Sequence, residues 1–212
     1  MKTRTKVFGL IMAAVMLVTV SVFTTMAYLT DSKEVHNTFT VGNVQITLDE
    51  TDVDDSTPSN SRDTSNTYTR MLPGSTYTKD PTVTVVAKSE KAYVRAFVTV
   101  TVADPVEFAK QFPNGITLED VVEGLSNDWT YTTYSVDAAK GTYVYECCYK
   151  TEVPYSENDT TLPPLFTAVE IPDDWTNAQL AAINNLKIDI EAQAIQADNF
   201  ADVDAAWKAF SK

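Results

Sequence analysis

Hydrophobic and polar residues alternate along much of the chain, which is the pattern of half-buried β-strands. The longest run is residues 91–104, where every second residue from Val94 to Val102 is apolar. Residues 186–195 alternate as clearly, with one side apolar and the other side formed by Lys187, Asp189, Glu191 and Gln193. Shorter strands are predicted at 39–41, 44–48, 83–85, 129–134, 142–153 and 165–171.

Short helices are predicted between some of these strands. Asp104 followed by Pro105 has the form of a helix start, because an aspartate caps the free amides and proline suits the first turn. Thr117 can cap a helix over 118–125, and a further capped helix is predicted within 173–184. Asp202 can cap a closing helix with three large apolar residues near one stripe: Val203, Trp207 and Phe210.

The order of these elements predicts an all-β protein, a jelly-roll-like antiparallel β-sandwich with short helices in the connections. Residues 42–212 are expected to form this single domain. Residues 49–67 are acidic and rich in Ser, Thr and Asn, so we expect an acidic loop inserted into it. Calcium binding is an alternative for this loop, although it lacks the glycine and final glutamate of an EF-hand.

The first residues have the form of a signal peptide. Lys2, Arg4 and Lys6 precede an uncharged apolar run over 7–23, and Thr25 and Ala27 are the small residues that a signal peptidase requires. Residues 1–27 are therefore predicted to be removed by cleavage between Ala27 and Tyr28. A retained membrane anchor is the alternative, but the run is at the short end of the roughly 17–25 residues that span a bilayer.

The charge of the chain limits its partners. It carries 29 acidic and 16 basic residues, a net charge of −13. Loss of residues 1–27 removes three bases and moves the net charge from −13 to −16. Such a surface disfavours binding to nucleic acid and to anionic membranes, since both need basic side chains.

Candidate catalytic residues are few. The chain has one histidine, His36, and two cysteines, Cys147 and Cys148. It contains neither an HExxH zinc motif nor a GxSxG nucleophile motif, so we expect no catalytic site, no metal and no cofactor. A glycosidase needs only two carboxylates and stays open as a mechanism. The adjacent cysteines are expected on opposite faces of a strand, one in the core and one outside.

Several motifs stand in an order that resembles a known family. They are AYLTDSKEVHNTFTVGNVQITL after the predicted signal peptide, LPGSTYTKDPTVTV, KAYVRAFVTV, LFTAVEIP, INNLKIDIEAQAIQADNF and the late Trp207. This arrangement is similar to the TasA/CalY (camelysin-like) family of secreted proteins of Gram-positive bacteria. The insert at 49–67 and the paired cysteines stand outside the resemblance.

The resemblance implies a structural subunit of extracellular biofilm-matrix fibres, released by a signal peptidase of the SipW type. Its partners would be further copies of itself or paralogous subunits, and it would be found in the extracellular matrix or at the cell surface, with no membrane insertion after cleavage. Two alternatives stay open. The family also carries a metallopeptidase label, and a monomeric surface adhesin or accessory fibre protein is the third reading.

In that family the N-terminal segment of one subunit completes the sheet of the next, which implies a donor strand over residues 28–41. Four alternate residues of this segment share a face if it is extended: Val35, Asn37, Phe39 and Val41. The hydrophobic phase changes at Gly42, which is the predicted hinge between donor and domain. The alternative is that the segment folds back as the first strand of its own sheet.

The cleavage site gives a direct prediction. The secreted protein is expected to begin at Tyr28, because the peptidase cuts after the small residue at Ala27. Intact-mass measurement of protein purified from the culture medium checks this. A mass that includes Met1 would contradict it.

Overall fold

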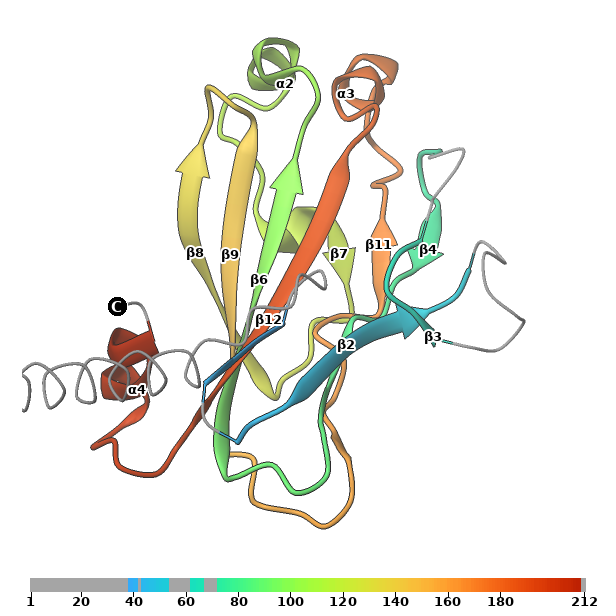
Figure 1. The fold of residues 1–212 in the computed structure, drawn as a ribbon. Coiled ribbons are helices and arrows are strands. Elements are labelled where there is room, and N and C mark those ends of the chain that lie inside the picture. The colour runs from blue at the N-terminus through green and yellow to red at the C-terminus, as the bar shows by residue number, and fades with distance from the viewer. Residues whose placement is uncertain (1–37, 42, 54–61, 67–71, 211–212) are drawn as a thin grey trace, which may run out of the picture. The chain divides into compact units, whose positions relative to one another are not determined.

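A five-stranded sheet forms the largest part of the fold (Figure 1). The computed structural model describes residues 38–41, 43–53, 62–66 and 72–210, all within one compact unit, 36–212. The strands of this sheet lie in the order β1 (Thr38–Val41), β12 (Lys187–Gln196), β6 (Ala92–Thr101), β9 (Thr142–Tyr149) and β8 (Trp129–Asp137).

Strand β6 is the centre of this sheet. It pairs with β12 over ten residues on one side and with β9 over seven on the other. The predicted alternation is confirmed, since Val94, Val98 and Val100 are at most 1% exposed. A strand that is apolar on one face and paired on both edges anchors the sheet to the core.

Two smaller sheets complete the fold. One has the order β10 (Thr160–Thr161), β5 (Thr82–Val85), β2 (Ile46–Thr51), β3 (Arg62–Asp63); the other has β4 (Thr76–Thr78), β11 (Ala168–Glu170), β7 (Val122–Glu123). Buried residues from all three sheets pack in one hydrophobic cluster. The all-β class with short helices is confirmed. Among the described strands, every pair is antiparallel except that of β1 with β12, which is parallel.

The predicted helix starts lie where the sequence places them. Helix α2 (Pro105–Gln111) is capped by Asp104, which accepts bonds from the amides of Val106 and Glu107 at 3.1 and 2.9 Å. Helix α3 (Asn177–Ala182) begins with a capping box between Thr176 and Gln179. Helix α4 (Val203–Phe210) follows Asp202, whose carboxylate accepts from an amide of its first turn at 2.8 Å.

The helix predicted over 118–125 is wrong beyond its first turn. Thr117 and Asp120 form the cap of a single 3-10 turn, η1 (Leu118–Asp120), and the chain then enters β7. Val121 and Val122 are both buried, and β7 pairs with β11. Burial of two successive branched residues suits a strand with packing on both faces, so tertiary contacts override the local helix pattern.

The predicted acidic insert 49–67 is not a loop throughout, because residues in its first and last thirds belong to strands. Asp49–Thr51 belong to β2 and Arg62–Asp63 to β3, while residues 54–61 lie outside the described part of the chain. Glu50 is buried and pairs with Lys79 at 2.5 Å, and it also accepts a bond of 3.0 Å from Asn66. A buried carboxylate needs such partners, because an unpaired charge in the core is costly.

Arg62 fastens β3 to the body of the fold. Its guanidinium pairs with Asp49 and, at 3.0 Å, with Asp80, which also accepts from the amide and hydroxyl of Thr51 at 2.6 and 2.9 Å. Partial burial raises the pKa of the Asp80 carboxyl, but the bonds from Thr51 and Arg62 outweigh it and hold the pKa below its ordinary value. The charged form of Asp80 therefore stabilises the folded protein.

This network predicts a dependence of stability on pH. Because the pKa is lowered on folding, the contribution of Asp80 is present above the unfolded pKa of about 4 and is lost as pH falls through the folded value. Asp80→Asn is expected to lower the free energy of unfolding at pH 7 by about 1 kcal/mol, since the site is partly exposed. Urea unfolding at pH 7 and pH 3 measures this.

The difference between Asp80→Asn and the unsubstituted protein should shrink at pH 3. Asp189→Asn is the matched control, since Asp189 is an exposed carboxylate that pairs with Lys187 on the surface of β12. The same loss at both pH values for Asp80→Asn would contradict the role given to its charge.

Candidate subunit-joining site

The described part of the predicted donor segment is strand β1. Phe39 and Val41 belong to it, and its backbone register places them opposite Gln193 and Ile195 of β12. Five other predicted site residues lie outside the described residues: Ala27, Tyr28, Val35, Asn37 and Gly42. The folded-back alternative therefore holds for residues 38–41 in the isolated chain.

The pairing of β1 is short and lies at the edge of the sheet. It covers four residues, from Thr38 opposite Ala192 to Val41 opposite Ile195. Parallel pairing is slightly less stable per residue than antiparallel pairing. The other half of the same β12 edge, residues 187–191, pairs with none of the described strands. Among the described strands, β1 thus pairs with about half of this edge and none pairs with the other half.

The occupied half of β12 is buried on both faces. Ala192 and Ala194 face the core, as predicted, while Ile195 and Gln193 on the other face are also buried. The prediction that Gln193 points to solvent beside Lys187 and Asp189 is wrong. The physical reason is that this end of the outer face is covered by Arg95 and by α4.

Arg95 lies against the outer face of the sheet at this place. Its side chain is about nine-tenths buried; Nε donates to Gln193 Oε1 and Nη1 to Glu146 Oε1, both at 2.9 Å. The guanidinium carbon lies 4.2 Å from the ring centre of Trp207 and 5.7 Å from that of Phe210, both on α4. A guanidinium can donate in its plane while aromatic rings stack on its face, so one side chain joins β6, β9, β12 and α4.

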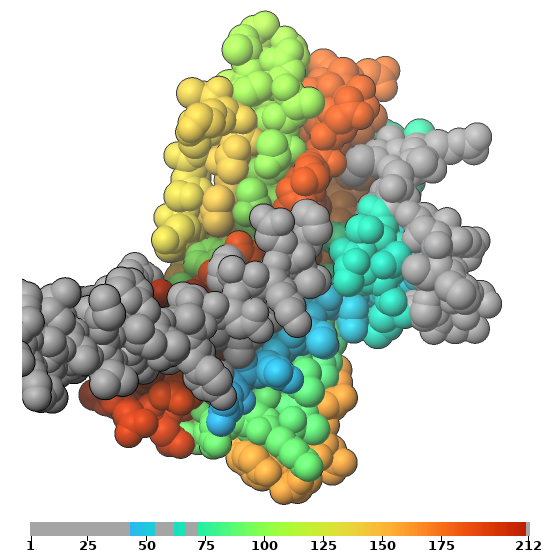
Figure 2. Space-filling model, viewed as in Figure 1, coloured from blue at the N-terminus to red at the C-terminus, as the bar shows by residue number. Residues whose placement is uncertain are grey.

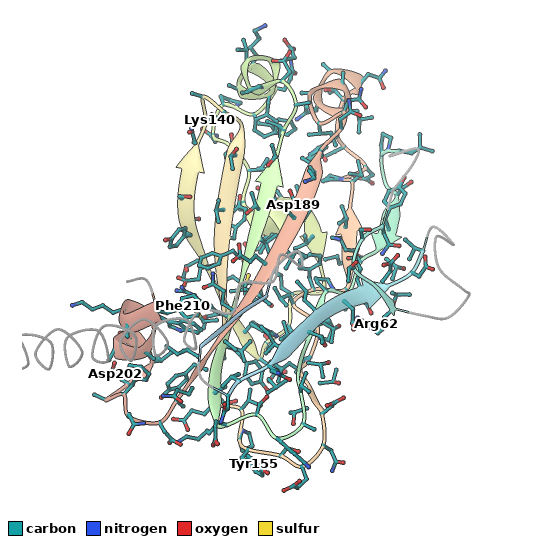
Figure 3. The ribbon with its side chains drawn as sticks, viewed as in Figure 1. Arg62, Lys140, Tyr155, Asp189, Asp202 and Phe210 are labelled. Atoms are coloured by element: carbon teal, nitrogen blue, oxygen red, sulfur yellow. The ribbon has the colours of Figure 1, made fainter. Side chains whose placement is uncertain are left out.

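Helix α4 packs on the same segment of β12. Ile195 forms a small cluster with Ala206 and Trp207, to which Phe200 and Phe210 add partly buried rings. Figure 3 places Phe210 on the inner side of α4, toward the sheet. Trp207 and Phe210 lie on the apolar face of α4, as predicted. Val203 does not: it is exposed, because the buried face of the helix runs through Ala206 instead.

The two cysteines lie on opposite faces of β9, as predicted, and both are free thiols. Cys147 is in the core, where burial raises its pKa to about 12. Cys148 is half-buried on the outer face, two positions from Glu146 along β9, and burial raises its pKa to about 11. Both are protonated at neutral pH, so they are poor nucleophiles here.

Metal ligands and membrane spans were candidates raised by the sequence. Within residues 38–210, the gaps at 42, 54–61 and 67–71 excepted, no three His, Cys, Asp or Glu side chains are grouped so that they could hold a metal ion. In the same stretches, none of the helices has the length and apolar character needed to cross a membrane. The apolar run 7–23 and His36 lie outside the described residues.

Comparisons with protein-family models, with curated proteins and with solved structures gave no match. The resemblance to the TasA/CalY family therefore stays a prediction from the sequence motifs.

The cluster around Arg95 was not predicted from the sequence. Alternation identified Arg95 and Gln193 as residues on the polar side of their strands, but not that they lie directly opposite each other. The signal that could have found them is the composition of the last helix, where two aromatic residues follow a strand whose polar side holds an uncharged glutamine.

Removal of Arg95 should destabilise this end of the sheet. Arg95→Ala leaves Glu146 and Gln193 without their donor and Trp207 without its stacking partner, so we expect a loss of about 2–4 kcal/mol. Guanidinium unfolding with tryptophan fluorescence measures it. Lys187→Ala is the control, because it breaks an exposed ion pair with Asp189 on the same pair of strands and should cost less than about 1 kcal/mol. Equal losses would contradict the anchoring role of Arg95.

Proposed function

We propose that the protein is a secreted, non-enzymatic structural subunit that polymerises into extracellular matrix fibres by exchange of its N-terminal strand. The observation that carries the proposal is β1, a four-residue edge strand at the N-terminal end of the described domain. A strand in this place can leave β12 without disturbing the antiparallel strands beyond it. The same position on β12 can then take the strand of a second copy, which is strand addition to an exposed sheet edge.

The length of the β12 edge favours a longer donor than β1. Continuing the parallel register from Thr38 opposite Ala192 would set Asn37 across from Glu191 and Val35 across from Asp189. Residues 187–191, which no described strand pairs with on this edge, could thus take five further residues of the predicted donor. A donor from a neighbouring copy is not restrained by a short connection to β2, so it can use the whole edge.

The β12 acceptor is held in place independently of β1. Ala192 and Ala194 are fixed by the core, and Gln193 and Ile195 by Arg95 and α4. The β12 edge therefore keeps its shape while one strand leaves and another binds. Such preorganisation lowers the conformational entropy that each exchange loses. Under this proposal the partners are further copies or paralogous subunits, and cleavage by a SipW-type signal peptidase frees the donor end.

A peptide of residues 28–41 tests the proposed joint. Added in excess to the purified protein, it should occupy the β12 edge and slow fibre elongation, measured by light scattering and electron microscopy. The same peptide with Phe39→Asp should have little effect, because the register sets position 39 opposite the buried Gln193, and a charge buried without a partner costs several kcal/mol. In the full chain, Phe39→Asp should likewise prevent elongation.

Thr47→Asp in the full chain is the matched control. It adds the same charge at an exposed threonine of β2, a strand that takes no part in the proposed exchange. Fibres of equal yield from Phe39→Asp and Thr47→Asp would show that another surface joins the subunits. A purified protein that forms no fibres would contradict the proposed function itself.

A further inference from the structure

Strand β8 forms the other edge of the five-stranded sheet. Eight of its nine residues pair with β9 on one side, and none of the described strands pairs with its outer side. Figure 1 and Figure 2 show the β8–β9 hairpin at the margin of the described domain, on the opposite side of the sheet from β12. From Thr132 to Lys140 every residue is exposed. The backbone groups on this side are therefore open to a further strand.

This edge lacks most of the features that keep edge strands from pairing. Soluble proteins usually place lysine or proline on such edges, or keep them very short. Residues 129–136 contain no charged residue, no proline and no glycine. One protective feature is present, an irregularity between Thr133 and Ser135 that leaves Tyr134 as an extra residue relative to β9.

The charges around β8 favour contact with a second copy. The chain has a net charge of −13, so most approaches between copies are repulsive, yet the middle of β8 is neutral. The charges lie at its two ends. Asp137 and Lys140 form an ion pair of 3.0 Å at the turn, and Asp128 stands before the first residue of the strand. An antiparallel partner centred on Tyr134 would set Asp137 of each copy opposite Tyr131 of the other, so no two carboxylates of the paired strands would face each other directly.

Aromatic side chains mark the centre of the same edge. Tyr134 is 62% exposed, and its ring packs edge-on against Phe97 at 4.9 Å between centroids. Phe97 belongs to the outer face of β6, opposite the buried valines. A two-fold axis at Tyr134 would bring the two tyrosines together on one face, flanked by both Phe97 rings. Cross-strand aromatic pairs of this kind stabilise antiparallel strands.

We propose that β8 is a self-association edge, at which a second copy of this chain pairs its own β8 in antiparallel orientation about a two-fold axis near Tyr134. Two five-stranded sheets then continue into one. The irregularity at Tyr134 lies on the axis, so both strands bend at the same place. A two-fold contact closes on itself and gives dimers. It uses neither β1 nor β12, so it is independent of the proposed strand exchange.

Sedimentation of the purified full chain with Thr132→Lys tests this edge. The unsubstituted protein should gain mass from monomer toward dimer as its concentration rises, and Thr132→Lys should stay monomeric at the same concentrations. Thr47→Lys is the matched control, since Thr47 is an exposed threonine of β2 outside this edge, and it should behave as the unsubstituted protein. The measurement is made in the Phe39→Asp background as well, so that fibre growth and edge pairing are read separately.

A cross-link distinguishes a two-fold contact from any other association. Residues directly opposite in an antiparallel pair have Cβ atoms about 4.5–5.5 Å apart, close to the separation that a disulfide spans. Tyr134→Cys should therefore give a disulfide-linked dimer under mild oxidation, on a non-reducing gel. Tyr155→Cys is the control, because Tyr155 is also an exposed tyrosine and lies at the other end of the domain from Lys140 (Figure 3).

Three results would overturn the inference. The first is a protein that stays monomeric in the Phe39→Asp background, and the second is a Thr132→Lys variant that dimerises as the control does. The third is cross-linking of Tyr134→Cys no faster than that of Tyr155→Cys. None of them would bear on strand exchange at β12, whose test measures elongation.

Discussion

The fold depends on the ten-residue antiparallel pairing of β6 with β12. The side chains on the inner face of this pair are small or β-branched. All of the following are buried: Val94, Ala96, Val98, Val100, Ile190, Ala192 and Ala194. Small residues on two neighbouring strands let the opposite sheets approach closely and fill the core without large gaps. Strands β1 and β9 extend its two edges, and α4 packs on β12.

The outer face of the same pair of strands is exposed at one end and buried at the other. Near Lys187 the face is polar and exposed, with an ion pair to Asp189. Near Gln193 the face is buried, because Arg95 satisfies the amide and carries the aromatic rings of α4. A charged side chain thus does what a leucine could not: it offers donors to two strands and a flat cationic surface to a helix.

Much of the fold could be predicted because strand alternation and helix capping are local. The strands at 91–104 and 186–195, the hairpin after Trp129 and the caps Asp104 and Asp202 all follow from neighbouring residues. What could not be predicted depends on which strands lie side by side. Glu50 is recognisable as buried only when Lys79 is known to face it, and residues 122–123 become a strand only because β11 is there to pair with.

The same limit applies to the candidate joining site. The donor segment was predicted from the resemblance to the TasA/CalY family, from its place after the expected cleavage site and from its alternate apolar residues. Nothing in the sequence indicated that Thr38–Val41 pair with the last long strand, or that the pairing is parallel. The register of a non-local strand pair comes from the packing of the whole sheet, which a single sequence does not display.

The position of β1 has a consequence for the order of folding. Thr38 and Ala192 lie 154 positions apart along the chain, so their contact closes almost the whole length of the domain. Such contacts form late, because the entropy of closing a long loop is lost before the contact repays it. Among the described strands, β1 comes first in the sequence and is expected to be one of the last to pair. Until the sheet is complete, β1 of each new molecule is exposed to any neighbour whose β12 is already in place.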